Sequence, residues 1–206
     1  MIKLTDLLNE IGDASVKAFP WTRKGNLKNF FARMKKKATT NYKDGEQFFY
    51  EVTSPSAVYT IFIGCYLKKR QSFILHFGDE PVPEQKLKYE MTVYIAFNIK
   101  GSKKEKETNL NEQYGLMSTL IECVSDFVNN TDEDIFIDTI NYAPKSDTGS
   151  ETEYDMESKR AKLYLAFLKK NIGKLPGKWT AFTTPSSMQI RQGDWSTTGN
   201  SIVAKS

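Results

Sequence analysis

The apolar run at residues 57–67, AVYTIFIGCYL, limits the possible folds of this chain more than any other feature. It is rich in β-branched and aromatic residues, which is typical of a buried strand. It carries no charge, and this continuous apolarity predicts that both faces of the strand are covered. The chain therefore has to build a sheet around this segment and pack other elements on it.

Further strand-like segments in the first half are separated by turn signals, Asp44–Gly45 among them. They lie at residues 47–53, 72–77 and 88–99. Short connections between neighbouring strands favour antiparallel pairing. Residues 46–100 are therefore predicted to form an antiparallel meander of strands.

The second half has helical periodicity. Apolar residues recur every three or four positions at 109–129 and 156–172, which predicts two amphipathic helices. Strand-like segments follow them at 134–141 and 179–182. The expected fold class is α+β, with a single mixed, largely antiparallel sheet and two main helices packed on it.

The N-terminal part is less uniform. Residues 4–11 predict a short helix, and residues 15–25 look extended because Pro20 disfavours helix at Phe19. Residues 26–38 remain open between helix and strand, although their apolar spacing favours a helix. We expect one domain at 1–182, made of an N-terminal helix and basic segment (1–45), the meander (46–100) and a helix–strand–helix–strand unit (109–182), followed by a Ser/Thr-rich tail at 183–206.

Cysteine and histidine usage excludes several site types. Cys65 and Cys123 each lie in an apolar run and are expected to be small buried hydrophobes. With His76 as the single histidine, no familiar zinc spacing exists. No stretch is long and apolar enough to cross a membrane, and acids within the N-terminal apolar stretch argue against a secretory signal.

Charge is distributed unevenly along the chain. Residues 14–43 contain nine cations and no acid, whereas residues 105–157 contain fourteen acids against Lys106 and Lys145. One interpretation is an electric field with two poles, whose positive pole attracts phosphates or an acidic protein. The alternative is a solvated surface, or internal pairing of the two regions.

The basic segment also contains aromatic residues, and this mixture suits single-stranded nucleic acid because cations neutralise phosphates while rings stack on bases. The same residues also suit an acidic protein surface, so both kinds of partner stay open. A lysine stripe on the last predicted helix could extend the patch. The candidate nucleic-acid or anion-binding residues are Trp21, Arg23, Lys24, Lys28, Arg33, Lys35, Lys36, Lys37, Lys159, Lys162 and Lys169.

Catalytic signatures are sparse. The chain has no Walker loop, no Rossmann glycine fingerprint and no nucleophile elbow. Asp134 and Asp138 share one face of a predicted strand and, with Asp132 and Glu133 nearby, could hold Mg²⁺. Acids at strand ends are usually solvated, so we predict no metal and no cofactor.

A stretch of the last predicted helix resembles a known enzyme family. Arg160-Ala161-Lys162-Leu163-Tyr164, in a strand–helix–strand–helix order, is similar to the end of the GCN5-related N-acetyltransferase fold. The resemblance implies acetyl-CoA as cofactor and Tyr164 as general acid for the leaving thiolate. At the place of the family's pyrophosphate loop, residues 113–118 have one glycine instead of two.

Three segments resemble uncharacterised small α/β proteins of tailed bacteriophages, namely KLTDLLNEIGDAS, LMSTLIECVSDFV and SKRAKLYLAFLKKNI. The resemblance implies a place in the virion or in the cytoplasm of an infected host, with a phage or host protein as partner. We therefore expect a non-enzymatic binding or structural protein that acts through charged surfaces on nucleic acid or a protein. The alternative is a divergent acyltransferase.

Overall fold

The computed structural model describes residues 17–41, 45–70, 88–100, 110–142, 159–183, 188–192, 195–198 and 201–204. The helices are α2 (Leu27–Lys37), α3 (Leu110–Asn129) and α4 (Lys159–Asn171), with a 3₁₀ turn at Ile172–Lys174. The strands are β1 (Trp21–Arg23), β2 (Glu46–Thr53), β3 (Val58–Lys69), β4 (Tyr89–Ile99), β5 (Ile135–Tyr142), β6 (Trp179–Thr183), β7 (Met188–Gln192), β8 (Trp195–Thr198) and β9 (Ser201–Ala204). The predicted helix at 4–11 and strand at 72–77, with His76, lie outside these residues.

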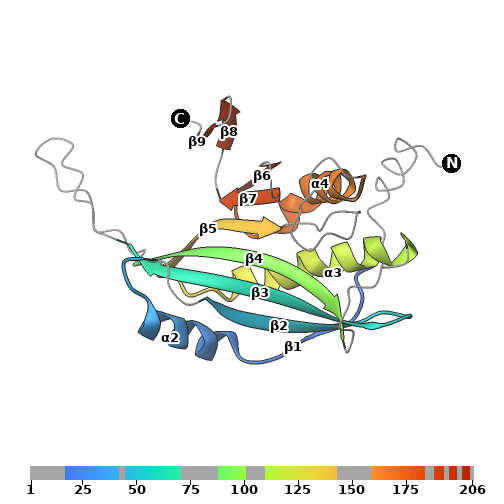
Figure 1. The fold of residues 1–206 in the computed structure, drawn as a ribbon, viewed down its shortest axis with the longest axis horizontal. Helices are drawn as coiled ribbons and strands as arrows, with labels where there is room; N and C mark the ends of the chain where they lie inside the picture. The colour runs from blue at the N-terminus through green and yellow to red at the C-terminus, as the bar shows by residue number, and fades with distance from the viewer. Residues whose placement is uncertain are drawn as a thin grey trace, which may run out of the picture.

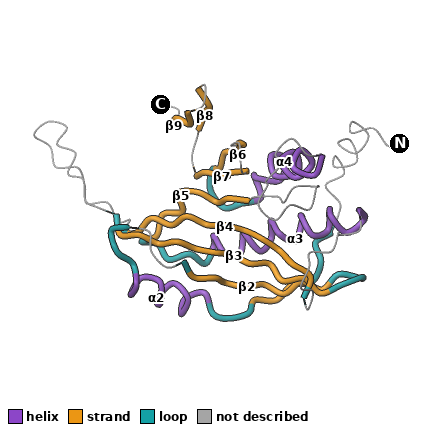
Figure 2. The backbone as a smooth tube through the Cα atoms, in the orientation of Figure 1, coloured by secondary structure: helices purple, strands orange, loops and turns teal. Residues whose placement is uncertain are grey.

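Seven strands form one sheet in the order β1-β2-β3-β4-β5-β7-β6 (Figure 1). All neighbouring pairs are antiparallel except β4 and β5, which are parallel and are connected through α3. The predicted fold class, α+β with one mixed and largely antiparallel sheet and two main helices, is confirmed. α2 is a third, shorter helix (Figure 2).

The core lies between the three helices and one face of the sheet. Phe30 and Phe31 of α2 meet Phe48 of β2 and Phe127 of α3, with ring centroids 5.3 to 6.4 Å apart. At the other end, Tyr164 of α4 packs edge-on against Tyr142 of β5. Such aromatic pairs add to the stabilisation from burial. The helices therefore share one face of the sheet, which we call the core face.

Residues 26–38, left open between helix and strand, are helical. Asn26 caps α2 by accepting a hydrogen bond from the Asn29 amide, and Leu27, Phe30, Phe31 and Met34 are buried. This helix, with β1 before it, packs against the rest of the domain, so residues 21–37 of the basic segment are part of the packed fold and do not form a separate arm. Because the apolar face of α2 is buried against the domain, the lysines on the rest of the helix lie at the domain surface.

The sheet extends beyond the predicted domain end at residue 182. β7 inserts between β5 and β6, and its Met188 and Ile190 are buried in the core. This part of the Ser/Thr-rich segment is therefore a sheet strand, because two apolar residues at alternate positions have the spacing of a strand that buries one face. β8 and β9 form a separate two-stranded hairpin, which Figure 1 shows away from the larger sheet.

For the 57–67 strand, the cover predicted on both faces is found on one face only among the described residues. In β3 the residues toward the helices are buried, namely Tyr59, Ile61, Ile63, Cys65 and Leu67. The alternate residues are only partly buried, or exposed in the case of Tyr66. The apolar run thus supplies a core face and a second face that is aromatic but accessible.

Candidate functional site

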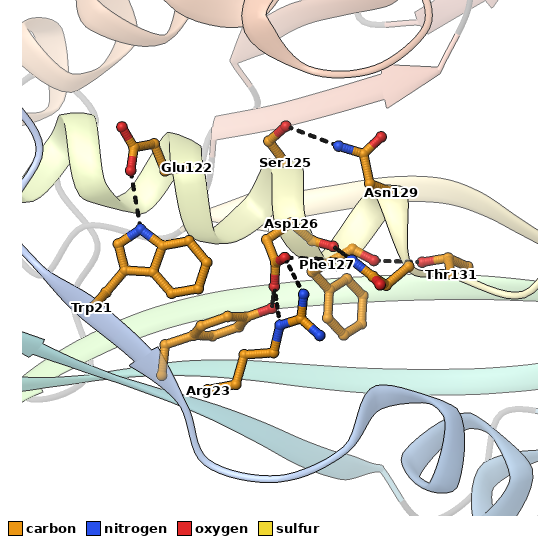
Figure 3. Close-up of polar contacts among 10 residues, drawn as sticks. Trp21, Arg23, Glu122, Ser125, Asp126, Phe127, Asn129 and Thr131 are labelled. Carbon is orange, nitrogen blue, oxygen red and sulfur yellow. Dashed lines mark hydrogen bonds and ion pairs between the residues drawn. The ribbon is translucent and has the colours of Figure 1, made fainter.

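The first part of the basic segment is attached to α3. The Phe19 amide donates to Thr119 Oγ1 at 2.8 Å, and the Trp21 indole donates to Glu122 at 3.0 Å. Figure 3 shows Trp21 and Arg23 of β1 both directed at α3, where Arg23 meets Asp126. Alternate residues of an extended segment thus contact successive turns of a helix.

Asp126 is the centre of a polar cluster. Its carboxylate accepts two hydrogen bonds from the Arg23 guanidinium, at 2.7 and 2.6 Å, and one from the Tyr50 hydroxyl at 2.9 Å. The Asn130 amide donates to it as well. Burial and the Asp126 carboxylate raise the pKa of Tyr50, so its hydroxyl remains a donor. Trp21 and Arg23 are therefore structural residues in this structure.

Lys35 of α2 lies between two acids of the α3–β5 connection. Its ammonium is 2.6 Å from Asp132 and 2.5 Å from Asp134. Burial alone would lower the pKa of Lys35, but the two carboxylates outweigh it and raise the pKa above its usual 10.5. Two of the acids that the sequence offered as metal ligands, Asp132 and Asp134, thus hold a lysine, and Asp138 accepts a hydrogen bond from Thr139.

The remaining cations of the basic segment divide into paired and solvent-facing residues. Lys24 pairs with Glu51, and Arg33 and Lys37 both pair with Glu46. Lys28 and Lys36 are exposed on the outer side of α2. Six of the eight candidates in this segment therefore hydrogen-bond or pair within the fold, three of them with acids of the 105–157 region, which weakens the picture of two separate poles.

The candidate lysines of α4 do not extend this surface. Figure 1 shows α2 and α4 at opposite sides of the molecule. Lys162 and Lys169 are exposed, and the side chain of Lys159 lies outside what the structure describes. The sequence could not place the two helices, because their separation depends on the order of strands in the sheet.

Tyr164 and Gly115 are packing residues. Tyr164 is 3% exposed and lies in the core against Tyr142. Gly115 is inside α3, where the Phe19 ring is so close that a Cβ would lie 2.4 Å from its Cζ atom. The segment at the place of the family's pyrophosphate loop, residues 113–118, is therefore part of α3, with the Phe19 ring against its glycine.

The cysteines are buried, as predicted. Cys65 and Cys123 are both inaccessible to solvent, and burial raises the pKa of each thiol. A thiol held in its protonated form is a poor nucleophile. Their environment indicates a packing role.

The accessible face of the sheet is the most distinctive surface of the described residues. We call it the open face: the side chains of β2–β5 that point away from the helices. Its aromatic members are Phe49, Phe62, Tyr66, Tyr94 and Phe136. Tyr66 and Tyr94 are 40% and 50% exposed, and they are the exposed large hydrophobic residues of the described chain. This grouping of accessible aromatic rings makes the open face the candidate binding surface of the described residues.

The aromatic residues of the open face form two ordered pairs. Phe49 and Phe62 are cross-strand neighbours with centroids 5.4 Å apart, and Tyr66 and Tyr94 lie edge-to-face at 5.6 Å. The backbone of Gly45 lies against the Tyr66 ring, so that a Cβ there would come within 2.8 Å of it. These contacts hold the tyrosine rings in place before any ligand arrives.

Cations surround the aromatic pairs. Lys24 and Lys100 meet at Glu51, while Lys68 and Arg70 meet at Glu90. Arg70 also lies over the Phe136 ring, 5.0 Å from its centroid. The open face thus combines cations with aromatic rings, the mixture that the sequence had suggested for the basic segment, and of the candidates from that segment it includes Lys24.

Sequence reasoning missed the open face, although a signal was present. In β4, Met91, Val93 and Ile95 are apolar and buried, whereas Thr92 and Tyr94 between them face away from the core. This period of two predicts one covered and one accessible face. This alternation in β4 was overlooked because the apolar run of the neighbouring strand β3 shows no such alternation in its sequence.

Substitution of Lys35, with Lys36 as the matched control, tests the ion pairs of Lys35 with Asp132 and Asp134. We expect Lys35→Gln to lower the free energy of unfolding by about 1 kcal/mol, because it leaves Asp132 and Asp134 facing each other without a cation. Lys36→Gln should change it by less than about 0.5 kcal/mol. Urea denaturation of both variants measures the difference, and equal losses would contradict the assigned role of Lys35.

Comparisons with protein-family models, curated proteins and solved structures gave no match. Within the part of the chain that the structure describes, no group of three or more His, Cys, Asp or Glu side chains is arranged to hold a metal ion. None of the described helices combines the length and the apolarity needed to span a membrane.

Proposed function

We propose that this protein is a non-catalytic binding protein that takes single-stranded nucleic acid on the open face of its sheet. The observation that carries the proposal is the pair of accessible, pre-oriented rings of Tyr66 and Tyr94 on a sheet face with cations at both ends. Unpaired bases stack on such rings, whereas the bases of a duplex are already stacked on each other. The acyltransferase alternative has no comparable support, since Tyr164 is buried.

Fluorescence anisotropy with labelled oligonucleotides tests this proposal. At about 50 mM salt we expect single strands to bind more tightly than duplexes of the same sequence. Tyr66→Ala and Tyr94→Ala should each weaken single-strand binding about tenfold, because each removes one stacking ring. Tyr66→Phe keeps a ring and is the matched control.

Two results would contradict the proposal. One is equal affinity for duplex and single strand, and the other is unchanged affinity in both alanine variants. Because both tyrosine side chains are accessible, the alanine variants should retain their thermal stability, so lost binding can be separated from lost folding. The phage context stays a prediction, which peptide mass spectrometry of purified virions tests.

A further inference from the structure

Gly64 leaves a gap among the side chains of the open face, in the middle of β3. The strand register runs through this residue without interruption, with Gln47 as its partner on β2 and Tyr94 as its partner on β4. Phe62 and Tyr66 lie two residues away on either side, on the same face of β3. We call the space above Gly64, bounded by these four side chains, the Gly64 gap.

The fold does not require a glycine at this position. The backbone of Gly64 does not adopt a positive φ angle. A Cβ atom on Gly64 would lie 3.7 Å from the Tyr94 carbonyl oxygen and 3.9 Å from the Tyr94 Cβ atom, which are ordinary contacts. Gly45, by contrast, has a packing reason, since a Cβ there would lie 2.8 Å from the Tyr66 ring. Glycine weakens the interior of a strand, and it often marks a place where a ligand approaches the backbone.

The Gly64 gap is accessible and has room for a flat ring. Gly64 is partly exposed, and apart from its chain neighbours only the two Tyr94 atoms, among the described residues, lie within 4 Å of the Cβ position. The backbone positions of Phe62 and Tyr66 are four residues apart, which corresponds to about 13 Å along a strand. Aromatic rings in contact have centroids about 4.5 to 7 Å apart, so a third ring fits between two flanking ones.

The groups around the gap suit a nucleobase better than an apolar side chain. The exposed Gln47 amide can both donate to and accept from the polar edge of a base. An apolar side chain would cover this amide without offering it a hydrogen bond. Further along the same face, Lys24 and Lys100 lie at Glu51, where a backbone attached to the base would pass near cations.

We infer that the Gly64 gap is the position at which one unpaired base of the bound single strand lies against the sheet. This inference rests on the proposed function and adds a base position to it. The base has its edge at the β3 backbone and the Gln47 amide, and the neighbouring rings contact its faces. The absence of a side chain at Gly64 is thus a requirement of binding and not of folding.

Gly64→Val, which fills the gap, tests the inference. Because valine favours strands and the space is open, this variant should keep or raise the melting temperature. Its affinity for a single strand, measured by fluorescence anisotropy at about 50 mM salt, should fall about tenfold, since one base loses its place. Gly64→Ala should show a smaller loss. The control is Ala96→Val at an exposed position of β4 on the same face but outside the gap, and its affinity should stay within about twofold of the natural protein.

The outcomes separate this inference from the proposed function. Unchanged affinity in Gly64→Val, with binding that still depends on Tyr66 and Tyr94, would overturn the base position and leave the proposed function standing. An equal loss in Ala96→Val would also overturn it, since any added bulk on the open face would then interfere. If Gly64→Val loses stability, Gly64→Ala decides, because its affinity has to fall at an unchanged melting temperature. If the natural protein binds no single strand even at low salt, both proposals fall.

Discussion

Replacing Asp126 with alanine is expected to lower the free energy of unfolding by about 3 kcal/mol, or the melting temperature by about 6 to 12 °C. The Tyr50 side chain is completely buried and its hydroxyl donates to Asp126. Without this acceptor the hydroxyl loses its hydrogen bond in the protein interior, where water cannot replace it. Arg23 loses its partner too, but at 39% exposure it can be hydrated. Thermal and urea denaturation measure the loss.

Two further variants identify the cause. Glu122→Ala removes the neighbouring hydrogen bond from Trp21, which lies at the protein surface, and should cost less than about 1 kcal/mol. Tyr50→Phe removes the buried donor, so Asp126→Ala should cost less in that background than in the natural protein. Equal and small effects of Asp126→Ala and Glu122→Ala would contradict the stabilising role that the geometry assigns to the Asp126 cluster.

Glu112→Gln is expected to destabilise the protein by about 2 kcal/mol at neutral pH, with a loss that disappears on acidification. Glu112 is 7% exposed, and its carboxylate accepts from the Ser56 amide at 3.0 Å and the Tyr59 hydroxyl at 2.9 Å. A glutamine can offer only one acceptor oxygen, so one of the two donors loses its bond. This contact attaches the β2–β3 turn to the beginning of α3.

The direction of the pH effect follows from the pKa of Glu112. Burial, the largest single influence, raises this pKa, but the hydrogen bonds from Ser56 and Tyr59 together lower it below its usual 4.5. The stabilisation is therefore complete above about pH 4.5 and is lost as the pH falls through the lower value in the folded state. Urea denaturation between about pH 3 and 7 should show the two proteins converging in acid.

The exposed Glu133 supplies the control for this experiment. Glu133→Gln should leave the stability close to that of the natural protein at every pH, because that side chain is exposed. A constant gap between the natural protein and Glu112→Gln down to pH 3 would show that the ionised form of Glu112 is not the source of its effect.

Local patterns predicted the elements well. The helical spacing at 109–129 matches α3, the spacing at 156–172 matches α4, and the 88–99 segment matches β4. These patterns work because they depend on neighbours along the chain, which repeat every two residues in a strand and every 3.6 in a helix. The buried cysteines were predictable for the same reason, since each lies in an apolar run.

The candidate site was not predictable from local patterns. The sequence by itself determined that cations without acids are concentrated in residues 14–43 and acids in the second half. Only the tertiary structure decided that Arg23 meets Asp126, about a hundred residues away, and that Lys35 meets two acids of the α3–β5 connection. It also decided that Tyr66 and Tyr94 share a face that none of the described helices covers. Charge pairing and exposure depend on which segments the sheet brings together, and that order is a property of long-range packing.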